Sequence, residues 1–171
     1  MVTVAIMAVL AALAAPSFTP LIERWRVRQV TEDLQSTLYF ARSEAMKRGG
    51  NIVLQKLPNN TGKCTTASGN SDWDCGWFVC LDANANGSCA ASETVLQRYD
   101  APANVQISRP GSGTGASIQF NRWGLPSGAL GLSFNVVPMN ASTANPAARG
   151  VCMSSGGRVR VIPSEEIPCN G

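Results

Sequence analysis

The stretch "VRQVTEDLQSTLYFARSEAMKRGG", residues 27–50, predicts the main structural element of the chain. Its apolar residues recur every three or four positions, and charged residues occupy positions between them. Two adjacent glycines end the pattern, as is typical of a helix C-terminus. The stretch therefore predicts an amphipathic helix. Its buried face is expected to hold Val27, Val30, Leu34, Leu38, Ala41 and Ala45.

Upstream of this stretch, the helical pattern continues into an uncharged apolar run. Residues 1–15 hold no charged side chain, but the run is shorter than the ~20 residues that span a bilayer as a helix. A secretory signal peptide is the alternative, but there the pattern would break after the run. We expect one helix from near residue 1 to about residue 48, kinked but not ended by Pro16.

After residue 50, the pattern changes to short strands and turns. Runs of alternating or β-branched residues are separated by clusters of Gly, Pro, Asn and Ser. An α+β fold follows, in which the helix packs on one or two antiparallel sheets. We divide the chain into an apolar transmembrane or filament-core part (1–22), an amphipathic remainder of the helix (23–50) and a β-rich head (51–171). The expected strands are 51–57, 75–81, 94–99, 104–108, 117–121, 130–137, 150–154 and 158–163.

The composition excludes several kinds of site. The chain has no histidine, which excludes histidine-based triads and most catalytic zinc sites. Only 15% of its residues are charged and the net charge is +3, and the pI near 8.6 is below the value of about 9 that marks a strongly basic nucleic-acid-binding domain. We expect no enzyme activity and no cofactor, and any anion must be bound by a local patch.

The six cysteines contain no C-x-x-C pair and predict three disulfides in an oxidising compartment. Fifteen pairings are possible. Cys75 and Cys80 lie an odd number of residues apart on one expected strand, so they should face opposite ways and have different partners. We favour pairs that close short loops, and a loop of about 15 residues is worth roughly 3 kcal/mol. These pairs are Cys64–Cys75, Cys80–Cys89 and Cys152–Cys169.

Several stretches resemble the type IV pilins and the pseudopilins of type II secretion. The apolar stretch 1–18 is similar to their amino-terminal segment. "ARSEAMKRG" (41–49), "DCGWFVCLDANANG" (74–87) with "ETVLQRY" (93–99), and "GRVRV" (157–161) resemble more narrowly the FimT/GspH-type minor pilins. The resemblance implies a pilin-like fold, with a long N-terminal helix, embedded in the membrane in its first part, packed on the sheet of a head.

The resemblance also implies a location and partners. Such a protein crosses the bacterial inner membrane once, with its head in the periplasm, and then joins a pilus or pseudopilus filament among other pilins. In the family, the mature chain begins a few residues upstream, with a phenylalanine at the cut site and a glutamate soon after. About six added residues would bring the apolar run to spanning length.

The stretch "GGRVRVIP", residues 156–163, is the main candidate for a binding site. On a strand, Val159 and Val161 would face the core while Arg158 and Arg160 face solvent. One interpretation is an ordinary solvated strand face. The other is a phosphate site, because the glycines would expose backbone N–H groups and because the planar fork of arginine suits phosphate oxygens. We favour phosphate binding.

The resemblance extends this interpretation to DNA. In FimT-like minor pilins, a G-R-x-R motif near the carboxyl end is associated with binding DNA during uptake, and Gly157, Arg158 and Arg160 match it. The expected bridge between Cys152 and Cys169 would hold the strand in place. Other arginines that would extend the patch are Arg149 and, less directly, Arg122 and Arg109.

The stretch "DANANGSCAASE", residues 82–93, fits a calcium-loop pattern through Asp82, Asn84, Asn86 and Glu93. Calcium takes six to eight oxygen ligands, and this loop has only two formal charges and lies between strands instead of helices. We favour a turn rich in Asn and Gly, and we expect no metal.

Three tryptophans and an acidic pair complete the candidates. Trp73, Trp77 and Trp123 offer aromatic faces on which bases stack, but we favour core packing for Trp77 and packing in a turn for Trp123. Glu165 and Glu166 would point apart on a strand, so we assign them to solvent.

The sequence therefore predicts a non-catalytic minor pilin that binds DNA weakly and without sequence preference, in support of DNA uptake. The alternative is a structural minor pilin or type II secretion pseudopilin that primes filament assembly by contacting other pilins, with no DNA binding. The arginine strand distinguishes the two, since an assembly subunit does not need it.

Overall fold

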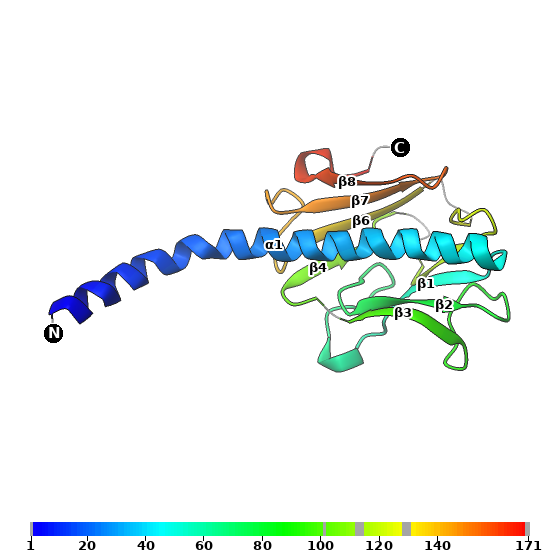
Figure 1. Ribbon diagram of the computed structural model, residues 1–171, viewed down its shortest axis with the longest axis horizontal. Helices are drawn as coiled ribbons and strands as arrows, with labels where there is room; N and C mark the ends of the chain where they lie inside the picture. Colours follow the sequence, from blue (N-terminus) through cyan, green and yellow to red (C-terminus); the bar gives the residue numbers. More distant parts are fainter. Residues whose placement is uncertain (1, 101, 112–114, 128–130, 170–171) are drawn as a thin grey trace.

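The computed structural model of the chain describes residues 2–100, 102–111, 115–127 and 131–169, without the side chains of residues 5–17. One long helix, α1 (Val2–Arg48), begins far outside the head and ends on it (Figure 1). The helix runs through Pro16 without a break, as expected. Its projecting part bends away from the axis of the part that lies on the head (Figure 1).

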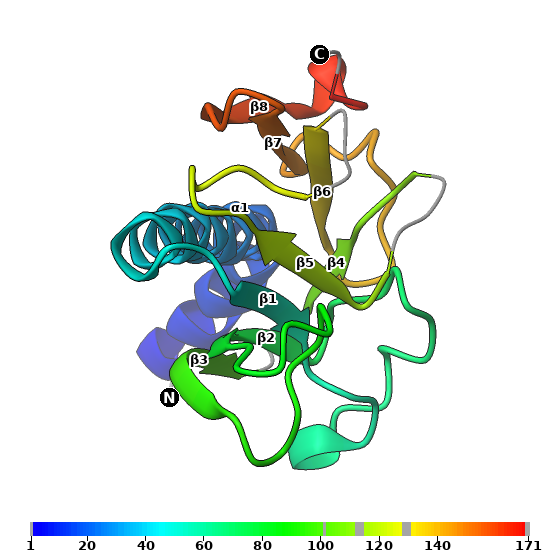
Figure 2. The same ribbon diagram turned by 90° about the vertical axis from the view of Figure 1, so that its right-hand side faces the viewer.

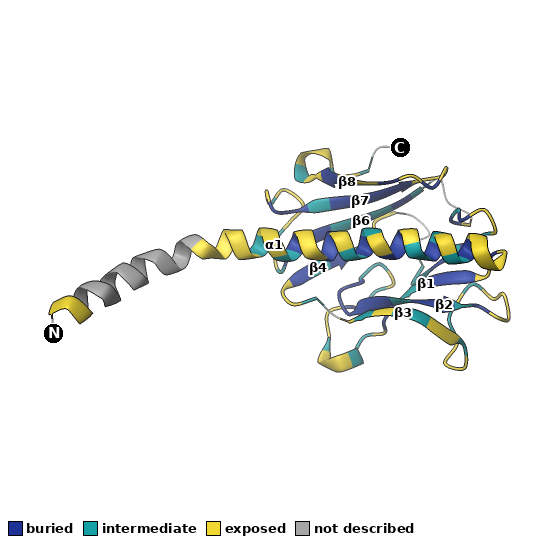
Figure 3. Cartoon of the chain, in the orientation of Figure 1, coloured by how far each residue is buried: buried dark blue, intermediate teal, exposed yellow. Residues whose placement is uncertain are grey.

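The face of α1 that the sequence predicts to be buried is buried. Its six apolar positions, from Val27 to Ala45, are at most 6% exposed and belong to the main core cluster. Figure 3 shows that each turn of α1 along the head carries both exposed and buried residues. The hydrophobic repeat therefore identifies both the extent of the contact and the face that makes it.

Eight strands are present among the described residues, each within two residues of its expected bounds. Of two short 3₁₀ helices, η1 (Thr61–Lys63) lies between the first two strands and η2 (Ser164–Glu166) follows the last. The strands are β1 (Ile52–Lys56), β2 (Gly76–Leu81), β3 (Thr94–Asp100), β4 (Val105–Ser108), β5 (Ser117–Phe120), β6 (Gly131–Pro138), β7 (Arg149–Ser154) and β8 (Val159–Pro163).

The strands form two antiparallel four-stranded sheets. The first has the order β3-β2-β1-β5 and the second β4-β6-β7-β8. The helix contacts strands of both sheets, so it covers the junction between them (Figure 2). In the same core, the rings of Trp73, before β2, and Phe134, on β6, meet edge to face with centroids 5.1 Å apart. The α+β fold is confirmed, and one core unites helix and sheets.

The three disulfides close the short loops favoured from the sequence. Cys64 pairs with Cys75, Cys80 with Cys89, and Cys152 with Cys169. The last pair ties the end of the described chain back to β7, beside β8.

The projecting part of α1 carries apolar side chains in solvent. Phe18, Leu21, Ile22 and Trp25 are between 45% and 64% exposed. The apolar part expected at 1–22 falls largely on residues whose side chains lie outside the described set. Among the residues that were described, no helix is both long and apolar enough to cross a membrane.

Candidate nucleic-acid interface

The two arginines of the candidate site lie at the start of an edge strand and line one hollow, Arg160 on β8 and Arg158 directly before it. β8 ends the second sheet, and Arg160 pairs with Cys152 on β7. Since side chains alternate along a strand, Arg158 and Arg160 share a face with Cys152, and both arginines are exposed. The backbone of Val159 faces α1, where its carbonyl accepts a hydrogen bond from the Tyr39 hydroxyl at 3.4 Å.

The expected burial of the two valines is half right. Val159 is 6% exposed and belongs to the core. Val161 is 39% exposed, so its expected core position is wrong. Because β8 is an edge strand, alternation places a side chain on a face of the sheet without guaranteeing that anything covers it.

A hollow of about 560 Å³ lies beside the arginines. Arg158 and Arg160 line it together with the disulfide of Cys152 and Cys169. Ser133 on β6 also lines it, beside Cys152 in the register of the sheet. The hollow therefore combines two guanidinium groups with small polar groups, and a disulfide forms part of its wall. Guanidinium groups in this setting are suited to bind phosphate oxygens.

The turn before the arginines differs from expectation. The N–H of Gly157 donates to the Ser154 carbonyl at 2.8 Å, and Gly157 is buried. The N–H of Arg158 donates to the Ser154 hydroxyl at 3.2 Å. The expectation that Gly157 exposes its N–H to a phosphate is therefore wrong. Gly156, the other glycine of the turn, is exposed. Gly157 has φ +82° and shapes the turn from which Arg158 emerges.

Arg42 on α1 holds this turn and was missed by the sequence reasoning. Its Nε donates to the Gly124 carbonyl at 3.0 Å, and its Nη1 donates to the Gly157 carbonyl. A Cβ on Gly157 would lie 2.6 Å from Arg42 Nη2, so the turn packs directly on the guanidinium. The one signal in the sequence that Arg42 contacts the head was its position directly after the core residue Ala41 in the helical repeat.

Arg122 and Trp123 lie in the second loop that Arg42 holds. Trp123 is 70% exposed, so its expected packing in the turn is wrong. Gly124 takes the contact with the helix instead, because a Cβ there would lie 3.1 Å from the Arg42 carbonyl oxygen and 3.2 Å from Met46 Cγ. Asn121 Oδ1 accepts the N–H of Trp123 at 2.9 Å and orders the loop.

Two other arginines do not join Arg158 and Arg160. Arg149 pairs with Pro163 at the opposite end of β8. Alternation along β7 also places it on the face opposite to Cys152. Its Nη1 donates to nearby backbone carbonyls. Arg109 is half-buried, donates to the carbonyls of Gly115 and Ser117, and has a pKa lowered by burial.

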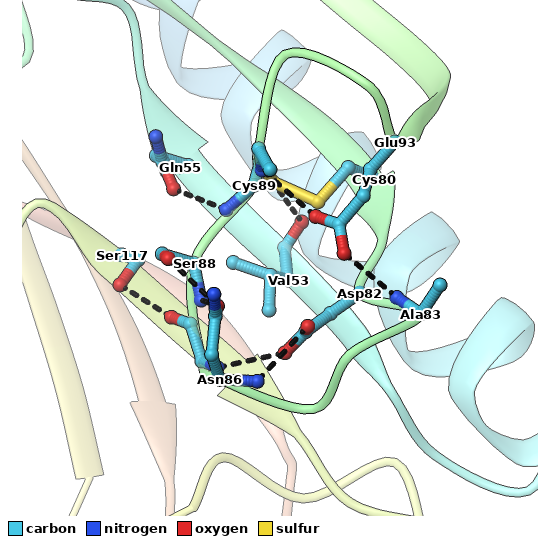
Figure 4. Close-up of a disulfide and its surroundings, with 12 residues drawn as sticks. Val53, Gln55, Cys80, Asp82, Ala83, Asn86, Ser88, Cys89, Glu93 and Ser117 are labelled. Atoms are coloured by element: carbon cyan, nitrogen blue, oxygen red, sulfur yellow. Dashed lines mark hydrogen bonds between the residues drawn. A yellow bond between two sulfur atoms is a disulfide. The ribbon is translucent and has the colours of Figure 1, made fainter.

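In the calcium-like loop, the acidic side chains accept hydrogen bonds from the backbone N–H groups of the same loop (Figure 4). The Asp82 carboxylate accepts the N–H groups of Asn86 and Gly87 at 3.1 and 2.8 Å. The Glu93 carboxylate accepts three further N–H groups, among them that of Ala90 at 2.8 Å. Asn84 Oδ1 likewise accepts the N–H of Asn86. The acidic residues thus stabilise a turn, and the described residues include no cluster of His, Cys, Asp or Glu that is positioned to hold a metal.

The remaining candidates are structural or solvated. Trp73 and Trp77 are at most 2% exposed, as favoured for Trp77. Trp77 Nε1 donates to the Thr37 hydroxyl at 3.0 Å. Glu165 and Glu166 are exposed, as assigned, but they lie in η2 instead of a strand, because β8 ends at Pro163.

A buried polar cluster lies at the other side of the head. Lys56 Nζ donates to the carbonyls of Ala67, at 2.9 Å, and Gly69. Asp74 accepts the N–H of Ile107 at 2.6 Å. Burial lowers the pKa of Lys56 and raises the pKa of Asp74. Lys56 thus bonds the loop before β2 and Asp74 ties that loop to β4, so the cluster organises the segment before β2.

Comparison with known proteins gives a family model and two solved structures. The model described as Type II transport protein GspH matches residues 30–157. The chain is also similar to the type IV minor pilin FimU of Pseudomonas aeruginosa (strain PAO1) in space group P21, with TM-score 0.63, 22% identity, and coverage of 83% of this chain and 92% of that chain. For FimU in space group P65, the TM-score is 0.59 and the identity 21%, with 81% and 94% covered. No curated protein matches the chain.

Proposed function

The chain belongs to the GspH family of type II transport proteins, and from this premise we propose that it is a non-catalytic minor pilin whose head captures DNA. The binding groups are Arg158 and Arg160. The observation that carries the proposal is their joint exposure at the start of β8, Arg158 directly before the strand and Arg160 on it, where both line the same hollow. The disulfide between Cys152 and Cys169 lines that hollow too, so the arginines lose less freedom on binding than they would on a mobile tail.

The binding we propose is weak and independent of sequence. Two arginines, with up to two neighbouring polar or charged groups, make about two to four phosphate contacts. Contacts to phosphate carry no base information, so they give non-specific Kd values on the order of 10⁻⁴ to 10⁻⁶ M. Several heads that act on one DNA molecule raise the overall affinity without new contacts.

The projecting helix supports the filament part of the proposal. Its exposed apolar side chains, such as Phe18, Leu21 and Trp25, need a covering that the head does not supply. We propose that the inner membrane covers the helix before assembly and that other pilins cover it in a pilus or pseudopilus. The head then lies in the periplasm, where an oxidising environment suits its three disulfides.

The test is DNA binding by the full chain in an uncharged detergent, measured by fluorescence anisotropy at low salt. We expect the Arg158→Ala/Arg160→Ala variant to lose binding. The control is Arg149→Ala, which removes the same kind of charge from the opposite face of the sheet and should bind like the parent. Loss of binding in the control, or binding retained in the double variant, would reject the arginine site.

The alternative is a subunit that only primes assembly, and the same exposed helix favours it. That role needs contacts with other pilins and none with DNA. If the parent chain does not bind DNA even at low salt, while the double variant supports filament assembly as the parent does, the assembly role alone remains.

A further inference from the structure

We propose that Arg122 and Trp123 form a second part of the same nucleic-acid site, and that Trp123 stacks on an unpaired base. The site would therefore prefer DNA with single-stranded character. This inference rests on the proposed function, because the phosphates are held by Arg158 and Arg160. It adds a class of ligand that the arginines alone do not select.

Arg42 brings the backbones of the two parts together. One guanidinium bonds the carbonyls of Gly124 and Gly157, so by its dimensions the two oxygens lie within about 8 Å of each other. Arg122 is two residues before Gly124, and Arg158 directly follows Gly157. Two segments that are far apart in the sequence therefore meet at the end of the head opposite to the N-terminus. Figure 2 looks at this end and shows the loop after β5 lying between the end of α1 and the turn into β8.

The charge at this end favours a polyanion. Glu44 pairs with Lys47 and Arg48 at 3.6 and 2.6 Å, which balances part of the basic helix end. No described carboxylate forms an ion pair with Arg122 or Arg158. Both arginines are exposed, so neither must give up a carboxylate partner before it contacts a phosphate.

Trp123 adds a contact that phosphate does not use. A tryptophan that is 70% exposed beside an exposed arginine offers a large aromatic face to the solvent. Stacking on such a face requires a base that is not already stacked inside a duplex. The bonds from Asn121 Oδ1 to the N–H groups of Trp123 and Leu125 hold the loop backbone, so the ring loses less freedom when it binds. The geometry thus points to single strands and frayed ends.

The experiment compares a short labelled single strand with the blunt duplex of the same sequence, using the full chain in uncharged detergent. We expect Trp123→Ala to weaken single-strand binding about fivefold to a hundredfold, in line with one lost stacking contact, and to change duplex binding by less than about twofold. The matched control is Trp25→Ala, which removes a tryptophan of similar exposure, 64%, from the projecting side of the head.

Intrinsic fluorescence gives a second measurement. Trp73 and Trp77 are buried, so in a Trp25→Phe background Trp123 is the remaining exposed tryptophan. Single-stranded DNA should quench its emission, and the duplex should quench it far less.

Arg42→Lys tests the positioning role of Arg42. Lysine keeps the charge but lacks the fork that bonds both carbonyls. The turn before Arg158 also loses a bond to Arg42, so we expect duplex binding to weaken. Single-strand binding should weaken further, so that the preference for single strands falls toward that of Trp123→Ala. An equal loss of both ligands would indicate general destabilisation and would reject the positioning role.

The outcomes separate this inference from the proposed function. If Trp123→Ala binds both ligands like the parent while Arg158→Ala/Arg160→Ala binds neither, the stacking site is wrong and DNA capture stands. If Trp123→Ala weakens both ligands equally, or alters only filament assembly, stacking is also rejected. If the double arginine variant binds like the parent, the proposed function itself fails.

Discussion

Thr37 shows how a single buried hydroxyl links α1 to the first sheet. It donates to the Asp33 carbonyl at 2.8 Å and accepts the Trp77 Nε1–H at 3.0 Å. Thr37→Val keeps the shape but leaves the indole N–H without its acceptor, so we expect a loss of about 1–3 kcal/mol in the free energy of unfolding. Urea denaturation under oxidising conditions measures it.

Thr31→Val is the matched control for this prediction. Thr31 is also buried on α1, but its hydroxyl donates only to the Val27 carbonyl one turn earlier. Its loss should cost less than about 1 kcal/mol. Equal losses in the two variants would show that the bond to Trp77 is not what Thr37 contributes.

Asp74 makes the stability of the head depend on pH. Burial raises its pKa in the folded state, so the folded chain holds the proton more tightly than the unfolded chain does. Its contribution to stability is therefore complete below the ordinary Asp pKa of about 3.9 and is lost as the pH rises through the raised value.

Asp74→Asn tests this dependence, because the amide oxygen still accepts the Ile107 N–H but the group cannot ionise. Relative to the parent, the variant should gain stability as the pH rises from about 4 towards neutral, as measured by urea midpoints. A difference between the two chains that stays constant or falls over this range would contradict the assignment.

The turn between β7 and β8 depends on one of its two glycines. Alanine at Gly157 meets Arg42 Nη2 at 2.6 Å and must adopt φ +82°. We expect Gly157→Ala to cost at least about 1–2 kcal/mol. Alanine at Gly156 meets only Ser154 Oγ at 3.9 Å, so Gly156→Ala should change stability by less than about 0.5 kcal/mol. Thermal unfolding of the pair separates the two roles, and equal effects would contradict the fit of the turn on Arg42.

The helix and strands were predictable because their signals are local. The three- and four-residue repeat identified every buried apolar position of α1 from Val27 to Ala45, and turn residues bounded all eight strands. The division into two sheets was not predictable, because it depends on which distant strands pair. Val161 was misplaced for the same reason, since alternation along β8 does not reveal that β8 is an edge.

The candidate site was predicted in part. The exposure of Arg158 and Arg160 follows from alternation with Val159. The role of Gly157 was not predictable, because it depends on a contact with Arg42 far away in the sequence. The exposure of Trp123 was also missed, since the local sequence does not show that Gly124 takes the contact with the helix.

The two ends of the molecule differ in chemistry. The projecting end of α1 exposes apolar side chains, which fits a membrane or a filament core. At the opposite end, Arg42 of α1 bonds the backbone of both the turn before Arg158 and the loop of Arg122. The fold thus separates the surface that we assign to assembly from the surface that we assign to DNA, so variants in one should leave the other unchanged.

The salt dependence of DNA binding tests the central proposal most directly. If Arg158 and Arg160 bind phosphates, the full chain should show a log–log slope of affinity against salt of about −2 to −4. The slope of the Arg158→Ala/Arg160→Ala variant, where binding is still measurable, should be flatter by about 2. A parent that shows no salt-dependent binding, or a variant with the slope of the parent, would contradict DNA capture by this strand.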